Sequence, residues 1–428
     1  MPEKIIRDPV HDVIAFRLED ATDALLFRLL NTVQFQRLRR IRQLGLANLA
    51  YPGADHSRYG HSLGVMETAR KMLGRLAEQV PVSQHQITIC LAAALLHDLG
   101  HGPFSHVFER VSGIDHEHLT QRLILDPDSQ VHQVLIEHDA ALPQAIVALM
   151  RCQPVRTWLC DILASQLDAD RLDYLLRDNL MTGSKYGDYD LSWLLRALTI
   201  DEASNRLAVT WKGISAVEAY LQSRYHMYHN VYFHKVVRSA EGMLKLALQR
   251  ARRLAVQGRL DGPHANSPAL KALLGQQLTI EQFSELDDVS VMHCFKLWAA
   301  GDEPVLASLC RGLLYRRLFK TIDLSGIDDP ATIGRMVQAV AQAIASQGGE
   351  PAYEMFYDEP FDTPYEIYQP EQLETTRGIL IKAADGSVRE FATISPLIGG
   401  LSRQLMFRRL HVAPQWAELA QTTLGRIQ

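Results

Sequence analysis

The sequence predicts a mainly α-helical protein with a small α+β unit at its C-terminal end. Apolar residues recur at intervals of three and four through most of the chain up to about residue 345, which is the spacing of amphipathic helices. After Ser346-Gln347-Gly348-Gly349 the pattern changes to short runs typical of strands. With 428 residues, 47% of them hydrophobic, the chain can bury one large core and a smaller appended one. We therefore expect a helical core over residues 1–346 and an α+β unit over residues 347–428.

Five apolar segments predict helices along the core. They are Leu25-Leu26-Leu29-Leu30, Ile87-Leu91-Leu95, Leu159-Ile162-Leu163-Leu167, Leu191-Leu194-Leu195-Leu198 and Ile333-Met336-Val340-Ile344. In the C-terminal unit, the runs 379–382 and 389–392 flank an Asp-Gly pair at residues 385–386, which is typical of a β-hairpin. We expect an irregular connector over residues 358–370 and a last helix over about residues 416–424.

Charge and cysteine content limit the function classes. The formal net charge of −5 argues against bulk affinity for nucleic acid or an anionic membrane. Basic clusters at residues 37–42, 250–253 and 316–320 are expected to be salt-bridged surface, although they could also hold phosphates. The five scattered cysteines predict neither a disulfide framework nor a zinc-thiolate site. No secretory leader and no apolar run of roughly 18 residues is evident, so we expect a cytoplasmic protein.

An adjacent His-Asp pair indicates a metal centre. His97 and Asp98 close the apolar run 91–96, where neither has a packing role. An imidazole nitrogen and a carboxylate oxygen on consecutive residues can reach one divalent ion, while the other ligands must come from elsewhere in the fold. His61 and Asp170 are the outlying candidates, because each stands close to an arginine that could face an anion. Together these four residues form the series H…HD…D.

Asp170 also begins a polar helix face. Its alternative role is a surface acid paired with Arg171 or Arg177. However, Asp170, Tyr174 and Asp178 stand at positions i, i+4 and i+8 and therefore share one face of a helix. Such a row could bind a metal at one end and a sugar at the other.

Histidines around the His-Asp pair are candidates for acid-base chemistry. His101 lies one helical turn after His97, and after the break at Gly102-Pro103 the chain could return His106 and Glu109 to the same cavity. His116 and Glu117 offer a further pair in which the carboxylate orients the imidazole. The alternative is that these histidines cap or bridge helices. His118, His132 and His138 are expected to be such surface or capping residues.

These motifs resemble the HD-domain phosphohydrolases, and within them the dGTPase-like deoxynucleoside triphosphate triphosphohydrolases with their vertebrate sterile-alpha-motif and HD-domain branch. The matching segments, in family order, are Asp8-Pro9-Val10-His11, 34–39, 51–54, 58–65, 97–108, 168–178 and 224–235. The resemblance implies one divalent ion held by His61, His97, Asp98 and Asp170, and a catalytic shell of His101, His106, Glu109, His116 and Glu117. It implies substrate contacts from Gln43, Leu44, Arg58, Arg171, Tyr174, Asp178, Arg224, Tyr232 and Phe233.

The roles within this substrate set are also implied by the resemblance. Arg58, Arg171 and Arg224 would face phosphate, for which a guanidinium fork is suited. Tyr174 would pack under the sugar C2′ and disfavour a hydroxyl there, while Asp178 would hold the 3′-hydroxyl. Tyr232 would contact phosphate and base.

The sequence departs from the vertebrate members at several positions. Arg171 replaces a lysine, Glu109 an aspartate and Phe233 a glutamine, so base selectivity is expected to differ. An effector site that binds guanine nucleotide in regulated members would here consist of Lys4, Asn31, Gln36 and Arg39. Asn31 replaces an aspartate and cannot offer the anionic acceptors that suit guanine, and Arg7 changes a second effector pocket. We therefore expect weakened or altered activation by nucleotides.

The function that the resemblance implies is metal-dependent hydrolysis of a deoxynucleoside triphosphate to deoxynucleoside and triphosphate. The alternatives are another phosphohydrolase, such as a nucleoside monophosphatase or a phosphodiesterase, or a non-catalytic nucleotide sensor. The metal could be magnesium, manganese, iron, zinc or another divalent ion, because a mixed His and Asp ligand set is permissive. By analogy with the family we expect a homo-oligomer, either a dimer or a tetramer, with deoxynucleoside triphosphates as substrate and effector.

Overall fold

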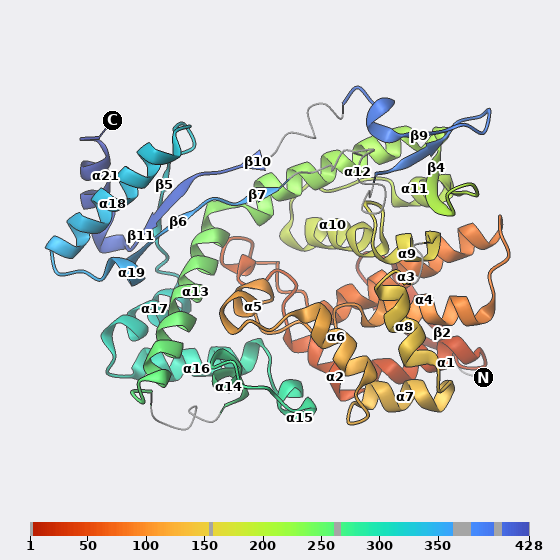
Figure 1. Ribbon diagram of the computed structural model, residues 1–428, viewed down its shortest axis with the longest axis horizontal. Coiled ribbons are helices and arrows are strands. Elements are labelled where there is room, and N and C mark those ends of the chain that lie inside the picture. The colour runs from red at the N-terminus through yellow and green to blue at the C-terminus, as the bar shows by residue number, and fades with distance from the viewer. Residues whose placement is uncertain (1–2, 154–156, 261–266, 363–377, 398–404, 428) are drawn as a thin grey trace.

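The computed structural model describes residues 3–153, 157–260, 267–362, 378–397 and 405–427, and it confirms the mainly α fold class (Figure 1). The helices before residue 200 are α1 (Ala21–Leu30), α2 (Val33–Arg37), α3 (Arg58–Ala77), α4 (Gln84–Leu96), α5 (His106–Ser112), α6 (His116–Leu125), α7 (Gln130–His138), α8 (Leu142–Met150), α9 (Trp158–Leu163), α10 (Ala169–Thr182) and α11 (Leu191–Ala197). Those after residue 200 are α12 (Ile214–Met227), α13 (Lys235–Val256), α14 (Pro268–Leu273), α15 (Ile280–Ser284), α16 (Asp288–Ala300), α17 (Pro304–Leu314), α18 (Pro330–Ser346), α19 (Pro351–Glu354) and α21 (Ala417–Leu424).

Short helical turns connect these helices. The 3-10 turns are η1 (Leu38–Arg40), η2 (Ala47–Leu49), η3 (Trp211–Gly213), η5 (Phe391–Thr393) and η6 (Pro414–Trp416), and the single π-helical turn among the described residues is η4 (Tyr228–Tyr232). Within the described residues, no helix combines the length and the apolar composition that crossing a bilayer would need.

In the described parts of the chain, four small sheets accompany the helices. β1 (Glu3–Asp8) pairs with β2 (Asp12–Arg17), and β7 (Phe361–Asp362) pairs with β10 (Leu405–Met406), both antiparallel. β5 (Lys320–Asp323) and β6 (Met355–Asp358) flank β11 (Arg409–Val412), again antiparallel. β3 (Leu198–Asp201), β4 (Arg206–Thr210), β8 (Leu380–Lys382) and β9 (Val388–Glu390) form a sheet in that order, with a parallel pairing of β4 and β8. The strands β1 to β5 lie in the region for which the sequence predicted helices.

The C-terminal part of the chain is divided between two places. The expected hairpin at residues 380–390 exists, but it extends the sheet of β3 and β4 in the helical body, far from β11 (Figure 1). The last helix, α21, packs on α18, and a second apolar cluster draws residues from both, such as Val340 and Leu424. That cluster takes residues from both sides of residue 346, and the domain boundary there stays a prediction. Of the expected connector 358–370, residues 363–370 lie outside the described residues, and β7 lies within the rest.

The main core centres on α3, which packs against both α4 and α10. The close approach of α3 and α10 requires Gly64, because a Cβ there would lie 1.9 Å from Asp173 Oδ1 and 2.3 Å from an Arg177 nitrogen. Gly100 likewise allows the chain to approach α6 closely, because a Cβ added there would lie 2.2 Å from the carbonyl oxygen of His116. The packing of the core therefore brings the start of α3, the end of α4 and the start of α10 close together.

Candidate active site

The four predicted metal ligands converge from three helix ends. His61 lies in the first turn of α3, His97 is the C-cap of α4 with Asp98 next to it, and Asp170 lies in the first turn of α10. Asp168 caps α10 by accepting a hydrogen bond from the backbone N–H of Arg171. Each ligand therefore stands on a rigid element with a defined start or end.

The donor atoms of these residues face one another. Asp170 Oδ1 lies 2.9 Å from His61 Nε2 and 3.7 Å from His97 Nε2. Asp98 contributes both oxygens, with Oδ1 at 3.3 Å from His97 Nε2 and Oδ2 at 3.9 Å from His61 Nε2. His61, His97 and Asp170 satisfy the geometry of a metal-holding group, with their donor atoms all within 4.8 Å of one another.

The hydrogen bonds of the two imidazoles fit a divalent metal. His97 Nδ1 lies 2.9 Å from the carbonyl oxygen of Ala94, to which it can only donate. His61 Nδ1 lies 2.8 Å from a carboxylate oxygen of Asp173. Both Nε2 atoms face carboxylates, His61 Nε2 that of Asp170 at 2.9 Å and His97 Nε2 that of Asp98 at 3.3 Å. Ring orientation by a carbonyl or carboxylate at the other nitrogen is the usual support of a metal-ligating histidine.

The charges of the centre are strongly coupled. Burial lowers the pKa of His61, but hydrogen bonds to Asp170 and Asp173 outweigh it and raise that pKa to about 10. Burial raises the pKa of Asp98, but Arg58 and the neighbouring histidines hold it well below its usual range. His61 and His97 likewise lower the pKa of Asp170 against the effect of burial. The carboxylates of Asp98 and Asp170 are therefore ionised at neutral pH and able to bind a cation.

Arg58 links the metal ligands to a strained turn. Its guanidinium donates to Asp98 and, through Nε and Nη2 at 3.1 and 2.7 Å, to Ser105 Oγ. Phe104 and Ser105 have positive φ angles of 50° and 51°, which non-glycine residues rarely adopt. Asp288 stabilises this turn by accepting a 2.8 Å hydrogen bond from the backbone N–H of Phe104. Strain of this kind persists where surrounding contacts hold it and is common at functional sites.

A second cluster of predicted residues adjoins the metal ligands. The His101 ring stacks on that of His116 with centroids 4.0 Å apart, and His101 Nε2 lies 3.3 Å from Asp98 Oδ1. Glu109 Oε2 lies 3.3 Å from His106 Nδ1 and 3.1 Å from His116 Nδ1. Burial, with Arg58 adding to it, lowers the pKa of His101 well below its usual range, so this imidazole is neutral. The cluster offers a neutral base beside carboxylate-linked imidazoles.

The structure does not bring Glu117 to this cluster. Glu117 is exposed in the first turn of α6, and Glu109 from α5 is the carboxylate that contacts His116. The reason is geometric, because consecutive residues of a helix point about 100° apart and cannot both face the cavity. Of the three histidines expected to be surface or capping residues, His132 contacts the carbonyl oxygen of Ile124, and His118 and His138 are exposed.

Both clusters open into one cavity of about 410 Å³. Its predicted lining residues are Gln43, Leu44, Arg58, His61, Asp98, His101, His106, His116, Asp170, Tyr174, Asp178, Tyr232 and Phe233. At the end away from the metal ligands, Asp178 accepts a 2.8 Å hydrogen bond from the Tyr232 hydroxyl. The π-helical turn η4 sets Tyr232 here, and π-helical turns are frequent at functional sites. The cavity thus runs from a metal-binding end to a polar and aromatic end.

Two predicted phosphate contacts do not line this cavity. Arg171 donates to Asp168 at 2.6 Å and to the carbonyl oxygen of Ser165. The guanidinium of Arg224 lies 5.4 Å from the centre of the Tyr228 ring. Arg58 is therefore the predicted arginine that faces the cavity directly.

Sequence reasoning missed several residues that shape the site. His56 Nε2 lies 2.8 Å from Asp178 Oδ1, and Asp173 supports His61 from behind. Arg37, expected as basic surface, is fully buried and donates to the carbonyl oxygens of Leu99 and His101. The segment 34–39 in the family match was the available signal for Arg37, whereas His56 stands outside every matched segment.

The expected effector residues lie on the surface near the N-terminal helices. Gln36 donates to the carbonyl oxygen of Leu30 and accepts from Arg39 Nε at 2.8 Å. Asn31 is exposed at the end of α1, and Lys4 is exposed on β1. The effector role of these four residues stays a prediction.

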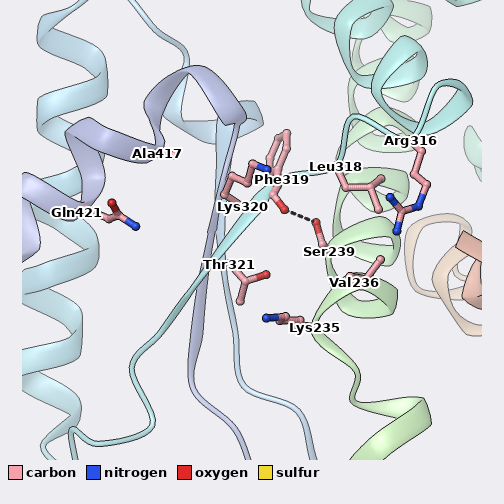
Figure 2. A pocket seen from close by; sticks show the side chains of 10 residues that line it. All are labelled: Lys235, Val236, Ser239, Arg316, Leu318, Phe319, Lys320, Thr321, Ala417 and Gln421. Atoms are coloured by element: carbon pink, nitrogen blue, oxygen red, sulfur yellow. Dashed lines mark hydrogen bonds between the residues drawn. The ribbon is translucent and has the colours of Figure 1, made fainter. Parts of the chain in front are cut away.

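Another cavity, of about 540 Å³, lies apart from the metal ligands (Figure 2). Figure 2 shows its residues on α13, on the segment leading into β5 and on α21, with Ser239 donating to the carbonyl oxygen of Phe319. Its charged lining residues are the cations Lys235, Arg316 and Lys320. It lacks the imidazole and carboxylate groups of the smaller cavity among its described lining, so the larger volume is not the candidate metal centre.

Comparisons with known proteins agree with this geometry. Models described as the HD domain and the HD associated region match residues 58–148 and 189–259. The uncharacterized protein YwfO of Bacillus subtilis is 36% identical over 94% of this chain and 89% of its own length. The deoxynucleoside triphosphate triphosphohydrolase SAMHD1 of Gallus gallus is 32% identical over 58% of this chain, which spans 45% of that protein. The crystal structure of a phosphohydrolase from Bacteroides thetaiotaomicron matches with a TM-score of 0.80 and 28% identity, covering 96% of this chain and all of that one.

Proposed function

Because the chain belongs to the HD-domain phosphohydrolase family, we propose that it hydrolyses deoxynucleoside triphosphates to deoxynucleoside and inorganic triphosphate. One observation carries the proposal. The predicted metal ligands His61 and Asp98 and the row Asp170, Tyr174 and Asp178 line the same 410 Å³ cavity, which is within the usual size of small-molecule sites. A phosphate at the metal end would then be followed by a sugar at Tyr174 and Asp178.

The residues have distinct tasks in this reaction. His61, His97, Asp98 and Asp170 would hold the divalent ion, which when bound polarises phosphate and lowers the pKa of water. Arg58 would neutralise phosphate oxygens, held in place by Asp98 and Ser105. Tyr174 would lie under C2′, where a hydroxyl would clash, and Asp178 would accept from the 3′-hydroxyl.

The acid-base steps fall to the histidine cluster. A bond forms between a water oxygen and the α-phosphorus, the bond from that phosphorus to O5′ breaks, and O5′ gains a proton. Neutral His101 is suited to take a proton, and the imidazole of His116, oriented by Glu109, is suited to supply one. Burial lowers the pKa of His106, which shares the contact with Glu109. The proton acceptor and the proton donor therefore line the same cavity.

The test is product analysis with each of the four deoxynucleoside triphosphates, alone and mixed, in the presence of a divalent metal. We expect deoxynucleoside and triphosphate from the wild-type protein and neither from Asp98→Ala. The mixed reactions show whether one nucleotide activates cleavage of another. Release of pyrophosphate or orthophosphate would instead favour another phosphohydrolase, and binding without turnover would favour a sensor. Size-exclusion chromatography with light scattering tests the expected dimer or tetramer.

A further inference from the structure

The turn between β1 and β2 makes buried polar contacts that the proposed reaction does not use. This turn is the segment Asp8-Pro9-Val10-His11, and the side chains of Asp8 and His11 are both buried. Asp8 Oδ1 accepts hydrogen bonds of 2.9 Å from the backbone N–H groups of Val10 and His11, which close the turn. A surface turn has no local need for a buried carboxylate and a buried imidazole.

Asp173 connects this turn to the metal ligand His61. Its Oδ1 lies 2.9 Å from His11 Nε2, and its Oδ2 lies 2.8 Å from His61 Nδ1. Arg177 donates to both oxygens, at 2.8 and 2.9 Å. Asp173 is fully buried and its carboxylate has four hydrogen-bond donors around it.

His11, Asp173 and His61 form a hydrogen-bonded series, here called the relay. The donor at its outer end fixes which nitrogen of His11 carries the proton. Lys71 Nζ, which can only donate, lies 3.2 Å from His11 Nδ1. His11 therefore carries its proton on Nε2 and donates it to Asp173. Asp173, paired with His11 and Arg177, accepts a hydrogen bond from His61 Nδ1, so Nε2 is the His61 nitrogen that faces Asp170.

Arg177 and Gly64 hold the relay against the helices. Arg177 also donates to Asp8, with Nη1 at 2.8 Å from Oδ2 and Nη2 at 3.2 Å from Oδ1. Gly64, one turn after His61, leaves the space that Asp173 and Arg177 occupy. Residues from β1, the turn, α3 and α10 thus meet around a single carboxylate.

We propose that Asp173 is a positioning residue for the metal centre and that the turn at residues 8–11, through His11 and with Arg177, sets the orientation of Asp173. The N-terminal hairpin is then part of the support of the metal site. The inference goes beyond the proposed function, because it concerns metal affinity and holds whatever the substrate is.

The first test is binding of Mn²⁺ and Co²⁺ alone to the full-length protein after chelation and dialysis, without nucleotide. We expect Asp173→Asn to weaken both affinities by roughly 10- to 100-fold, the usual effect of losing the partner of a ligating histidine. We expect the visible spectrum of bound Co²⁺ to change as well, because the ligand field reports the orientation of the His61 ring.

A matched control separates positioning from general stability. Asp161 is as buried as Asp173 and is paired with Arg206 through two hydrogen bonds of 2.6 and 2.9 Å, but it contacts no metal ligand in the described structure. Asp161→Asn should lower stability and leave the Mn²⁺ and Co²⁺ affinities within about twofold of wild type. Equal weakening by Asp161→Asn and Asp173→Asn would overturn the proposal.

Substitution of His11 tests the outer part of the relay. His11→Phe removes the donor to Asp173, and we expect Co²⁺ affinity to fall by at least about threefold. His11→Gln keeps an N–H donor, and we expect it to restore most of that affinity. If His11→Phe binds Co²⁺ as tightly as wild type, the turn has no part in positioning the metal ligand.

Discussion

The candidate metal centre and the C-terminal sheet each bury a histidine, and the pKa values of these two histidines are shifted in opposite directions. His61 in α3 is 1% exposed and His411 in β11 is 0% exposed. Despite burial, the carboxylates of Asp170 and Asp173 raise the pKa of His61 to about 10. Burial lowers the pKa of His411 to about 4, and the carboxylate of Asp358, 4.0 Å away, offsets only part of this effect. Partners, and not depth, decide the charge of a buried imidazole.

The difference indicates what each region is built for. Around His61 the protein accepts the cost of buried charges and surrounds them with matched partners, as a metal-binding site requires. His411 instead stacks on Phe356, with ring centroids 4.6 Å apart and an interplanar angle of 9°, as a neutral aromatic ring would. We therefore expect substitutions in the first region to change metal binding and catalysis, and substitutions in the second to change stability alone.

Removing a metal ligand should give the largest effect. Asp170→Ala deletes the carboxylate that faces both His61 and His97, so we expect bound metal to be lost and kcat/KM to fall by a factor on the order of 10⁴. Metal content by mass spectrometry and product formation measure this. Asp328→Ala, at a fully exposed carboxylate, is the control and should change neither quantity. Retention of the metal by Asp170→Ala would remove this residue from the ligand set.

The next largest difference in kcat is expected between variants of Glu109 in α5 and Glu117 in α6. We expect Glu109→Gln to lower kcat by roughly 10³-fold, because it weakens the contact that orients His106 and His116. We expect Glu117→Gln, at an exposed side chain, to change kcat by less than about twofold. Both variants should keep their metal. The opposite result would restore the role that the sequence assigned to Glu117.

These glutamates show how far the sequence could predict the site. Asp170, Tyr174 and Asp178 were placed on one face by helical spacing alone, and all three line the cavity. Choosing between Glu109 and Glu117 required knowing where the short helices α5 and α6 begin, because a shift of one residue rotates a side chain by about 100°. The positive φ angles at Phe104 and Ser105 bring α5 back toward the metal ligands, and nothing in local propensity predicts them.

Long-range pairing explains the parts of the fold that the sequence did not predict. The hairpin at residues 380–390 was predicted from its turn residues, but its parallel partner β4 lies about 170 residues earlier in the chain. β11 likewise pairs with β5 and β6, which precede it by tens of residues. Short strands such as β5 carry too few residues for their alternation to show, so tertiary contacts decide their conformation.

The C-terminal sheet should respond to pH in a way the metal centre does not. The unfolded chain protonates His411 near its ordinary pKa of 6.5, and the folded chain only near 4. The stabilising contribution is therefore complete above pH 6.5 and is lost as pH falls through this window, by up to about 3 kcal/mol. Urea unfolding of wild type and His411→Phe between pH 7.5 and 4.5 measures it.

Activity supplies the second half of that test. The free energy of unfolding of His411→Phe should fall less steeply with acid than that of wild type, while its activity at pH 7.5 stays the same. Parallel pH profiles for the two proteins would show that folding does not lower the pKa of His411, and the contrast with His61 would then fail.

The smallest effect is expected at Ser105, where function and stability oppose each other within one residue. Its hydroxyl accepts two hydrogen bonds from Arg58, but its backbone, at φ 51° and ψ −123°, lies in a region that favours glycine. Ser105→Ala should lower kcat/KM by about tenfold, because Arg58 keeps Asp98 but loses its second support. Ser105→Gly should lose the same activity and gain about 1 kcal/mol of stability from relief of strain. Ser62→Ala is the matched control for activity, because it removes a buried hydroxyl next to His61 that has no hydrogen-bond partner among the described residues. If Ser105→Gly gains no stability, the turn is not strained, and the polar contacts of the site hold a conformation that the chain would adopt without them.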